Sequence, residues 1–477
     1  MKSLLKIIIL FSITTTLQAG GFALSGVGSR AIGMAGAFRS VSDDWTAIFW
    51  NPAGLTQTGY SINLSGIFIT PYASLEPNTG ILGYDGPYTM RYKVSAKKQN
   101  FIIPSFGLIT PYEIKEGRLA FGFFVPFGLG SKWDLYDFPM GYYNTEDTTF
   151  TPPEMEKYDW QSDIKVFAFY MGISKRFGKA SLGLSFGPVL TQIYMRRVSF
   201  VDPATMEPEA TQLPLQYRLF PIDTELDGSG WSLGVTFGAL YDISEKLRLG
   251  ASVRYYTRTS LDGTASLKLY FPKNDYIASQ LDTTQAFLFS GEVATGSGDV
   301  STHITLPVNA GVGISYRPMS NLTLAFDVDY TRWSSFDKIP LEFKDLVLAI
   351  GGFVPIDTVE ADTLIEEWSN SLRYSFGVEY RIIPRLVLRG GVYYDESPVP
   401  DTTITPLIPD IGNKIGVNAG FTYDIAPNLS ITMNYEYVRA KDRDAERTSD
   451  YSYESHYFAG KYSMKVHAAG IGIEYKF

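Results

Sequence analysis

The chain has 477 residues, of which 45% are hydrophobic and 15% aromatic, and it contains no cysteine. The absence of cysteine excludes a disulfide framework and thiolate metal sites. The net charge of −9 disfavours nucleic acid as a partner, because phosphate binding needs a basic surface. Abundant aromatic residues and glycine, with a mean hydropathy of −0.03, suit strands that are apolar on one face only.

The N-terminus has the pattern of a secretory signal. Lys2 and Lys6 precede an apolar run that ends at Ile13, and Ala19 offers a small residue for cleavage. We therefore predict that residues 1–19 are a signal peptide. A membrane helix is the less favoured interpretation, because the apolar run is too short to span a bilayer. No long apolar run follows residue 20, so a membrane-spanning structure would have to be a closed barrel.

The rest of the chain alternates apolar and polar residues, as half-buried strands do. In the last segment Ala469, Ile471, Ile473, Tyr475 and Phe477 alternate with small or polar residues. Tyrosine often closes the apolar face, which matches an aromatic girdle at a membrane interface. We predict about fourteen strands, near 59–70, 98–112, 116–130, 161–177, 179–197, 229–242, 245–260, 303–317, 320–334, 370–381, 384–395, 413–424, 427–440 and 464–477.

The connections between these strands alternate in length. Short ones fall near 112–116, 177–179, 242–245, 317–320, 381–384 and 424–427, and long ones fall between them. Outer-membrane barrels have short periplasmic turns and long extracellular loops, whereas a soluble sandwich does not segregate loop lengths in this way. The fold class is therefore predicted as all-β, an antiparallel transmembrane barrel over residues 59–477 in the outer membrane of a Gram-negative bacterium.

Residues 20–58 precede the first strand, are rich in glycine and alanine, and do not alternate. A barrel of about fourteen strands has an interior too wide for its own side chains to fill. We predict that this segment forms a plug inside the barrel. A general water-filled porin is disfavoured for the same reason, because a porin needs an open lumen.

Several short motifs resemble the FadL/TodX family of outer-membrane channels for hydrophobic substrates. They are Gly21-Phe22-x-Leu24, Arg30-Ala31-x-Gly33, Ala35-Gly36-Ala37, Asp43-Asp44 and Asn51-Pro52-Ala53-Gly54, with a second match at Pro126-Phe127-Gly128-Leu129 followed by Trp133. The motif resemblance covers the plug and the third strand. The strand number, the signal peptide and the terminal Phe477 fit the family over the whole chain.

The resemblance implies a mechanism. Extracellular loops capture the ligand, which moves to a pocket near the mature N-terminus and leaves sideways through a gap at a kink in the third strand, without an energy source. It implies a hatch or gate role for Phe22, Asn51, Pro52 and Ala53, although a turn joining plug to barrel is the simpler interpretation. The implied partners are a hydrophobic small molecule, outer-membrane lipid and lipopolysaccharide, around a monomer.

The third strand supports such a gap on physical grounds. If residues 117–130 alternate regularly, Gly122, Pro126 and Gly128 face inward and Phe127 faces outward. Proline cannot donate a ladder hydrogen bond, and glycine lets the backbone bend. Because the resemblance also implies a gap here, we predict a lateral opening at these three residues. The alternative is that they relieve crowding in the lumen or end the strand.

Charged residues fall on the predicted inward faces, among them Arg248, Arg254, Arg373, Arg381 and Arg389. Arg254 and Arg389 are candidates to hold a ligand carboxylate by a bidentate pair. The alternative is an internal ion network with Asp327, Asp329, Glu379 and Glu436. Asp43 and Asp44 are expected to fix a turn or to pair with arginines in the lumen.

Other chemistry has little support. His303, His456 and His467 lack metal-ligand spacing, and nucleophile-elbow and P-loop motifs are absent, so no enzyme, metal or other cofactor is predicted. The apolar segments 212–221 and 340–355 either capture ligand or pack on one another. A second possible function is that of a PorV-like partner for other exported proteins, since such proteins resemble the same family.

Overall fold

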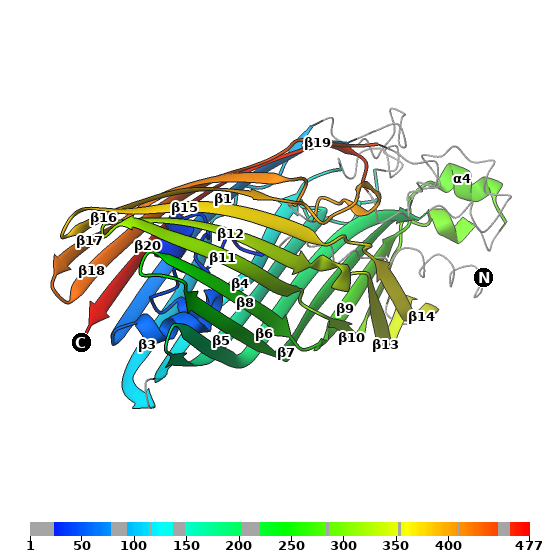
Figure 1. Ribbon diagram of the computed structural model, residues 1–477. Coiled ribbons are helices and arrows are strands. Elements are labelled where there is room, and N and C mark those ends of the chain that lie inside the picture. The colour runs from blue at the N-terminus through cyan, green and yellow to red at the C-terminus, as the bar shows by residue number, and fades with distance from the viewer. Residues whose placement is uncertain are drawn as a thin grey trace.

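A closed antiparallel β-barrel forms the body of the molecule (Figure 1). The computed structural model describes residues 23–77, 93–114, 117–136, 148–201, 220–282, 286–351, 354–407, 410–446 and 458–477. These residues include twenty strands in one sheet, of which fourteen close the ring. They are β1 (Ser61–Pro77), β3 (Phe101–Ile114), β4 (Gly117–Trp133), β5 (Trp160–Phe177), β6 (Ala180–Val201), β7 (Phe220–Asp242), β8 (Leu247–Tyr256), β11 (Val308–Met319), β12 (Leu322–Arg332), β15 (Ser371–Ile383), β16 (Leu386–Asp395), β17 (Lys414–Ala426), β18 (Leu429–Ala440) and β20 (Gly460–Lys476).

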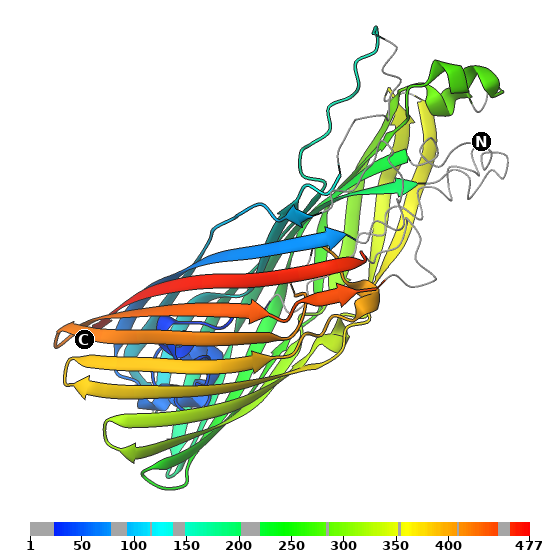
Figure 2. The same ribbon diagram turned by 90° about the horizontal axis from the view of Figure 1, so that it is seen from above.

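The predicted fold class is confirmed. β1 and β20 close the barrel by pairing from Ser61 with Lys476 to Pro77 with Gly460. Short turns join neighbouring strands at one end, as the alternation of loop lengths predicted (Figure 2). The strands are longer than expected, since β6 has 22 residues and β7 has 23. A transmembrane strand needs only about 9–11 residues, so the sheet continues beyond the membrane.

Two of the long connections predicted between barrel strands, near 261–302 and 335–369, contain further strands that were not predicted. These segments hold β9 (Thr259–Tyr270), β10 (Val293–Ile304), β13 (Lys338–Ile350) and β14 (Val354–Ile365), with α4 (Asp275–Gln280), η6 (Ala286–Phe289) and η7 (Trp333–Ser335). The four strands pair in the order β9, β10, β13, β14. β9 also pairs with the first half of β7, from Ile222 to Ser229. They form an extension that projects from the end of the barrel opposite the short turns (Figure 2). The remaining short elements are β2 (Val94–Ser95), β19 (Arg443–Ala445) and η8 (Asp401–Thr403).

Apolar packing explains why the extension is ordered. Ile339, Leu341, Phe343, Leu346 and Leu348 of β13 are buried in the main hydrophobic core. This accounts for the apolar character of 340–351 and supports the packing interpretation of that segment. Of the other apolar segment, 212–219 lies outside the described residues, and Phe220 packs against Phe271 and Phe289 with ring centroids 5.8 and 6.1 Å away.

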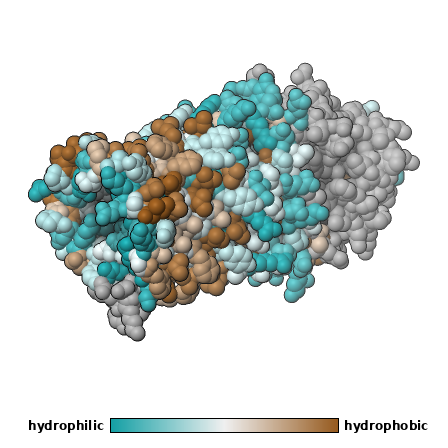
Figure 3. All heavy atoms as spheres, viewed as in Figure 1, coloured by the Kyte–Doolittle hydropathy of each residue, from teal (hydrophilic) through white to brown (hydrophobic). Residues whose placement is uncertain are grey.

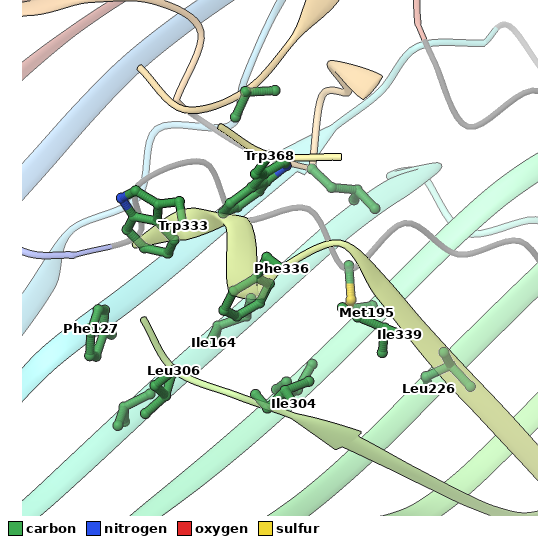
Figure 4. Packing of buried hydrophobic residues seen from close by; sticks show 14 of the residues in the cluster. Phe127, Ile164, Met195, Leu226, Ile304, Leu306, Trp333, Phe336, Ile339 and Trp368 are labelled. Carbon is green, nitrogen blue, oxygen red and sulfur yellow. The ribbon is translucent and has the colours of Figure 1, made fainter. Parts of the chain in front are cut away.

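The same core reaches down into the mouth of the barrel (Figure 4). It joins Phe127 and Ile164 of the barrel wall to Trp333, Phe336 and Trp368, and Figure 4 also labels Met195, Leu226, Ile304, Leu306 and Ile339. The Trp368 ring centroid lies 5.3 Å from those of both Trp333 and Phe336. The space above the plug is therefore lined by hydrophobic and aromatic side chains.

The outer face of the barrel is apolar. Leu64, Phe237, Val312, Ile415 and Ile473 are all exposed there, as is a series of tyrosines that includes Tyr241, Tyr255, Tyr316, Tyr380, Tyr423 and Tyr475. Figure 3 shows hydrophobic side chains gathered over the barrel and hydrophilic ones next to the extension. An apolar band with aromatic residues is what a lipid-facing barrel surface needs.

No helix among the described residues is both long enough and apolar enough to cross a membrane.

Residues 23–58 lie inside the barrel, towards the end with the short turns (Figure 2). They form α2 (Ser29–Gly33), α3 (Ala47–Trp50) and η1 (Pro52–Gln57). Glycines in the wall make room for this plug. A Cβ at Gly183 of β6 would overlap Pro52, and one at Gly238 of β7 would overlap Asn51. Within the plug, a Cβ at Gly54 would overlap the backbone carbonyl of Ser42.

This close approach predicts the effect of adding one methyl group. Gly54→Ala should lower the free energy of opening the plug by about 1–3 kcal/mol, because overpacking forces the backbone apart. Gly59→Ala is the matched control, since a Cβ there would have no atom within 4 Å. Hydrogen exchange of the amides in residues 47–57 measures the difference. Equal exchange rates in the two variants would contradict the close packing of plug residues Ser42 and Gly54.

Candidate ligand cavity and lateral opening

The barrel wall is interrupted between β3 and β4. Their ladder runs from Ile114 paired with Gly117 to Phe106 paired with Phe123, and no further ladder pairs of β3 with β4 follow among the described residues. The next backbone hydrogen bond across the seam is that of the Lys97 amide, which donates to the Lys132 carbonyl oxygen over 2.8 Å. The ladders between β1 and β3 and between β4 and β5 continue beyond this point. β1 pairs with β3 as far as Phe101, and β4 pairs with β5 as far as Trp133. The gap therefore lies between these two strands.

A β-bulge in β4 lies beside the gap. Phe124 pairs with Ala168, but Phe127 pairs with Val166, so β4 has one extra residue at Val125–Pro126. A bulge reverses the facing of all residues that follow it. Phe127 is consequently buried at 5% exposure, and Gly128 pairs with Lys165, which is exposed on the outer face. The predicted orientations of Phe127 and Gly128 are wrong, because regular alternation was assumed across Pro126.

The three residues predicted for the opening have different positions. Gly122 pairs with Gly107 in the closed part of the ladder, and a Cβ there would lie 3.0 Å from the Ile48 side chain of the plug. Gly122 thus makes room for the plug, below the gap. Pro126 and Gly128 both lie at the gap itself.

The first described residues of the chain lie against the open edge of β4. Ala23 forms an antiparallel bridge with Phe127, and the Leu24 amide donates to the Pro126 carbonyl oxygen over 3.1 Å. Phe22, predicted to belong to the hatch, lies outside the described residues. The segment after it borders the gap from the lumen side.

A cavity of about 530 Å³ passes through the gap. On the lumen side it is lined by Leu24, Val438 and Met464, and on the outer side by Ile102 and Pro104 of β3. Ile102 is 73% exposed. The volume lies within the range of roughly 300–1,000 Å³ typical of small-molecule pockets. The cavity thus connects the interior of the barrel with its lipid-facing surface.

The inner end of this wall cavity is polar. Its lining there comprises Arg373, Tyr393, Asp395, Asp410, Lys414 and Glu436. The Arg373 guanidinium lies 3.8 Å from the ring centroid of Tyr393, and its Nη2 donates to the Ala35 carbonyl oxygen over 3.2 Å. Lys414 Nζ lies 3.0 Å from Asp410 Oδ2. Burial raises the pKa of the Asp410 carboxyl, and Lys414 opposes that rise.

A smaller cavity of about 90 Å³ adjoins the first. It is lined by Trp50, Phe127 and Trp333, and it shares Arg373 and Lys414 with the wall cavity. Because Phe127 and Trp333 also belong to the aromatic core in Figure 4, the small cavity lies between that core and the opening in the wall.

The arginines predicted to hold a ligand carboxylate lie elsewhere. Arg254 lines the small cavity, where its Nη2 donates to the Phe49 carbonyl oxygen over 2.5 Å and its guanidinium lies 3.5 Å from the Phe49 ring centroid. Arg389 Nε donates to Glu379 over 2.6 Å, outside the wall cavity. Arg373, which does line the wall cavity, was expected to face inward but was not singled out.

An ion network joins the plug to the wall. Arg30 of the plug donates to Glu379 of β15 over 2.9 and 3.0 Å and also pairs with Asp43 at 2.5 Å. Asp44 Oδ1 accepts hydrogen bonds from the Thr46 amide and hydroxyl. The structural interpretation of this acidic pair is confirmed. A cavity of about 480 Å³ at the short-turn end is lined by the same charged groups, which makes it unsuitable for an apolar ligand.

A second set of ionic contacts surrounds Arg39, whose guanidinium pairs with Asp329 and also contacts Ser252 and Asn309. The amides of Phe38 and Arg39 donate to Asp327 over 2.8 and 2.7 Å. Of the expected internal network, the pair of Arg389 with Glu379 is present. Asp327 and Asp329 instead contact Arg39 of the plug, and Glu436 forms no ion pair among the described residues.

Asn51 ties the plug directly to the wall. Its Nδ2 donates to the carbonyl oxygens of Arg39 and Ala239 over 2.8 and 3.0 Å, and its Oδ1 accepts from the Ala53 amide over 3.2 Å. In the part of the chain that the structure describes, no group of three or more histidine, aspartate or glutamate residues is arranged to hold a metal ion.

The buried pair of Arg39 with Asp329 should contribute more to the free energy of unfolding than an exposed ion pair does. Arg39→Met should lower the free energy of unfolding by about 3–5 kcal/mol, because it leaves the Asp329 carboxylate buried without its partner. Arg176→Met removes a pair with Asp242 in which the arginine side chain is 45% exposed, and should cost less than about 1 kcal/mol. Urea unfolding in detergent measures both. Similar losses of unfolding free energy in the two variants would contradict a larger contribution from the buried Arg39–Asp329 pair.

Comparison with known proteins gives a consistent result. Residues 10–477 match a family profile described as outer membrane protein transport protein (OMPP1/FadL/TodX). Outer membrane protein P1 of Haemophilus influenzae is 22% identical, over 96% of each chain. A long-chain fatty acid transport protein of Escherichia coli is 21% identical, over 93% of each. The chain spans about half the length of two other relatives, 52% for one from Neisseria meningitidis and 55% for one from Pasteurella multocida.

Solved structures share the fold. A FadL homologue of Pseudomonas aeruginosa superposes with a TM-score of 0.72 at 17% identity, covering 96% of this chain and all of that one. The toluene transporter TodX of Pseudomonas putida gives a TM-score of 0.67 at 17% identity, covering 95% and 99% of the two chains.

Proposed function

Because the chain belongs to the outer membrane protein transport protein family (OMPP1/FadL/TodX), we propose that it carries hydrophobic compounds passively across the outer membrane. The protein is a multi-strand β-barrel of that membrane. Relatives are named for transport of long-chain fatty acids, and a structural neighbour is named for toluene. The compounds proposed for this chain are therefore fatty acids or hydrocarbons.

The wall cavity is the observation that carries the proposal. It reaches from the lumen at Leu24 to the lipid-facing side at Ile102, above a plug that is held by one partly buried and one buried ion pair. An apolar solute that left through the plug would have to pass charged groups and enter water. Transfer from an apolar cavity directly into lipid avoids that cost. The route proposed is therefore sideways, between β3 and β4, down the concentration gradient.

The upper part of the route uses the aromatic core. We assign ligand capture to the mouth of the barrel below the extension, where Trp333, Phe336 and Trp368 lie in one cluster. Phe127 connects that cluster to the small cavity beneath it, because its ring centroid lies 6.4 Å from that of Trp333. The ligand would then pass Leu24 and enter the gap in the wall.

Filling the gap tests lateral release. Gly128→Trp should slow uptake of labelled oleate and labelled toluene by at least about tenfold, because the indole would occupy a pocket that buries most of a small ligand. A Cβ at Gly128 has no atom closer than 3.8 Å, so the variant should fold. Gly390→Trp on β16 is the control, since a Cβ there also has no atom closer than 3.8 Å.

Uptake is compared in cells with equal amounts of each variant in the outer membrane. Unchanged uptake with Gly128→Trp would contradict the sideways route. If wild-type cells take up neither compound faster than cells without the protein, the transport proposal fails and a role as partner of other exported proteins gains support.

Asn51, Pro52 and Ala53 are proposed to hold the hatch closed. Asn51→Ala removes both hydrogen bonds to Arg39 and Ala239. At about 0.5–1.5 kcal/mol per bond, the open plug should become about tenfold more populated, which planar-bilayer conductance would record. Gln57→Ala, at the end of η1, should leave conductance unchanged. Identical conductance of the Asn51 variant and wild type would argue against an anchoring role.

A further inference from the structure

This inference rests on the proposed function and concerns which ligands the wall cavity accepts. The inner end of the cavity holds more acidic than basic groups. Three carboxylates line it, from Asp395, Asp410 and Glu436, against two cations, Arg373 and Lys414. The charged pair at the outer mouth, Lys165 and Asp163, lies 2.7 Å apart and is balanced.

Both cations at the inner end already have partners within the protein. Lys414 forms an ion pair with Asp410. Arg373 donates to the Ala35 carbonyl oxygen and covers the Tyr393 ring. Asp395 and Glu436 line the same end of the cavity, so that one guanidinium faces two carboxylates.

The two remaining acids are less well satisfied. Glu436 is only 3% exposed, and its buried Oε1 has no hydrogen-bond partner among the described residues. Asp395 is half-buried, and its side chain forms no hydrogen bond or ion pair within the same residues. The carboxylates of Glu436 and Asp395 therefore line the inner end beside one guanidinium, that of Arg373, which also donates to the Ala35 carbonyl oxygen.

A ligand carboxylate placed here would meet a like charge at close range, and it would lose hydration beside Glu436, which is only 3% exposed. Both effects disfavour a charged ligand. A hydrocarbon needs no polar partner, and a hydroxyl group can donate to the unpaired oxygen of Glu436. We propose that the wall cavity selects uncharged hydrophobic compounds, hydrocarbons and alcohols, over carboxylates of the same chain length, and that Glu436 and Asp395 set this preference.

The charged groups that line the adjoining small cavity do not offset the excess of carboxylates in the wall cavity. Its lining includes Arg39, Arg254, Arg373 and Lys414 together with Asp329, Asp395, Glu396 and Asp410, which gives equal numbers of cations and anions. Arg39 is paired with Asp329. Arg254 is bonded to the Phe49 carbonyl oxygen, but its buried Nε lacks a partner among the described residues, so it is the cation to test.

The experiment compares dodecan-1-ol with dodecanoate on the purified full-length protein. Each ligand competes with a fluorescent apolar probe at about pH 8, where a fatty carboxyl group is ionised. Wild-type protein should bind the alcohol at least about tenfold more tightly than the carboxylate, the size of one unfavourable charge contact. Glu436→Gln and Asp395→Asn should each reduce that ratio, mainly by strengthening dodecanoate binding.

Glu474→Gln is the matched control, because Glu474 belongs to the same barrel but lines the polar cavity at the short-turn end. It should leave the ratio unchanged. Equal binding of both ligands to wild type would overturn the inference and leave the transport proposal standing. Loss of dodecanoate binding in Arg254→Gln would also overturn it, by placing the carboxylate in the small cavity. Failure of both ligands to displace the probe would overturn the ligand cavity itself.

Discussion

Lipid offers no hydrogen-bond partner to a backbone amide, and the rest of the structure depends on that constraint. It requires the sheet to close on itself, which β1 and β20 achieve along their full paired length. It also restricts how the wall can open. At the gap, Pro126 has no N–H to leave unpaired, and its carbonyl oxygen accepts from the Leu24 amide. The opening thus lies where Leu24, near the N-terminus, provides the hydrogen bond to the Pro126 carbonyl oxygen that β3 does not provide.

The width of the ring creates the second requirement, a filled interior. The plug meets it with small residues against wall glycines and with buried charges that are paired across the interface, such as Arg39 with Asp329. A buried charge pair is costly to break from either side. The plug is therefore held firmly at the short-turn end, while the apolar cavity opens sideways above it. Geometry and charge together support the proposed exit of an apolar solute through the wall.

Much of this architecture could be predicted from the sequence. Alternation and turn length gave the number of barrel strands and their order, because both depend on local chain properties. The extension was missed, since β9 and β10 carry glycine and aspartate within their alternation and their burial depends on packing with β7 and β13. The bulge at Val125–Pro126 was also missed. One extra residue reverses the facing of Phe127 and Gly128, and alternation alone cannot reveal it.

The residues of the wall cavity could likewise be predicted only in part. Pro126 and Gly128 were found because proline and glycine have known backbone properties. Arg373 was not distinguished from other inward arginines, because its place beside the gap depends on the register of distant strands.

The central claim is that an apolar ligand leaves between β3 and β4, and the most direct test is a crystal structure with a bromoalkane whose bromine is located by anomalous scattering. The account predicts bromine in the wall cavity, between Ile102 and Gly128. Bromine beside Arg30 and Glu379, in the polar cavity at the short-turn end, would show a route past the plug and would contradict it.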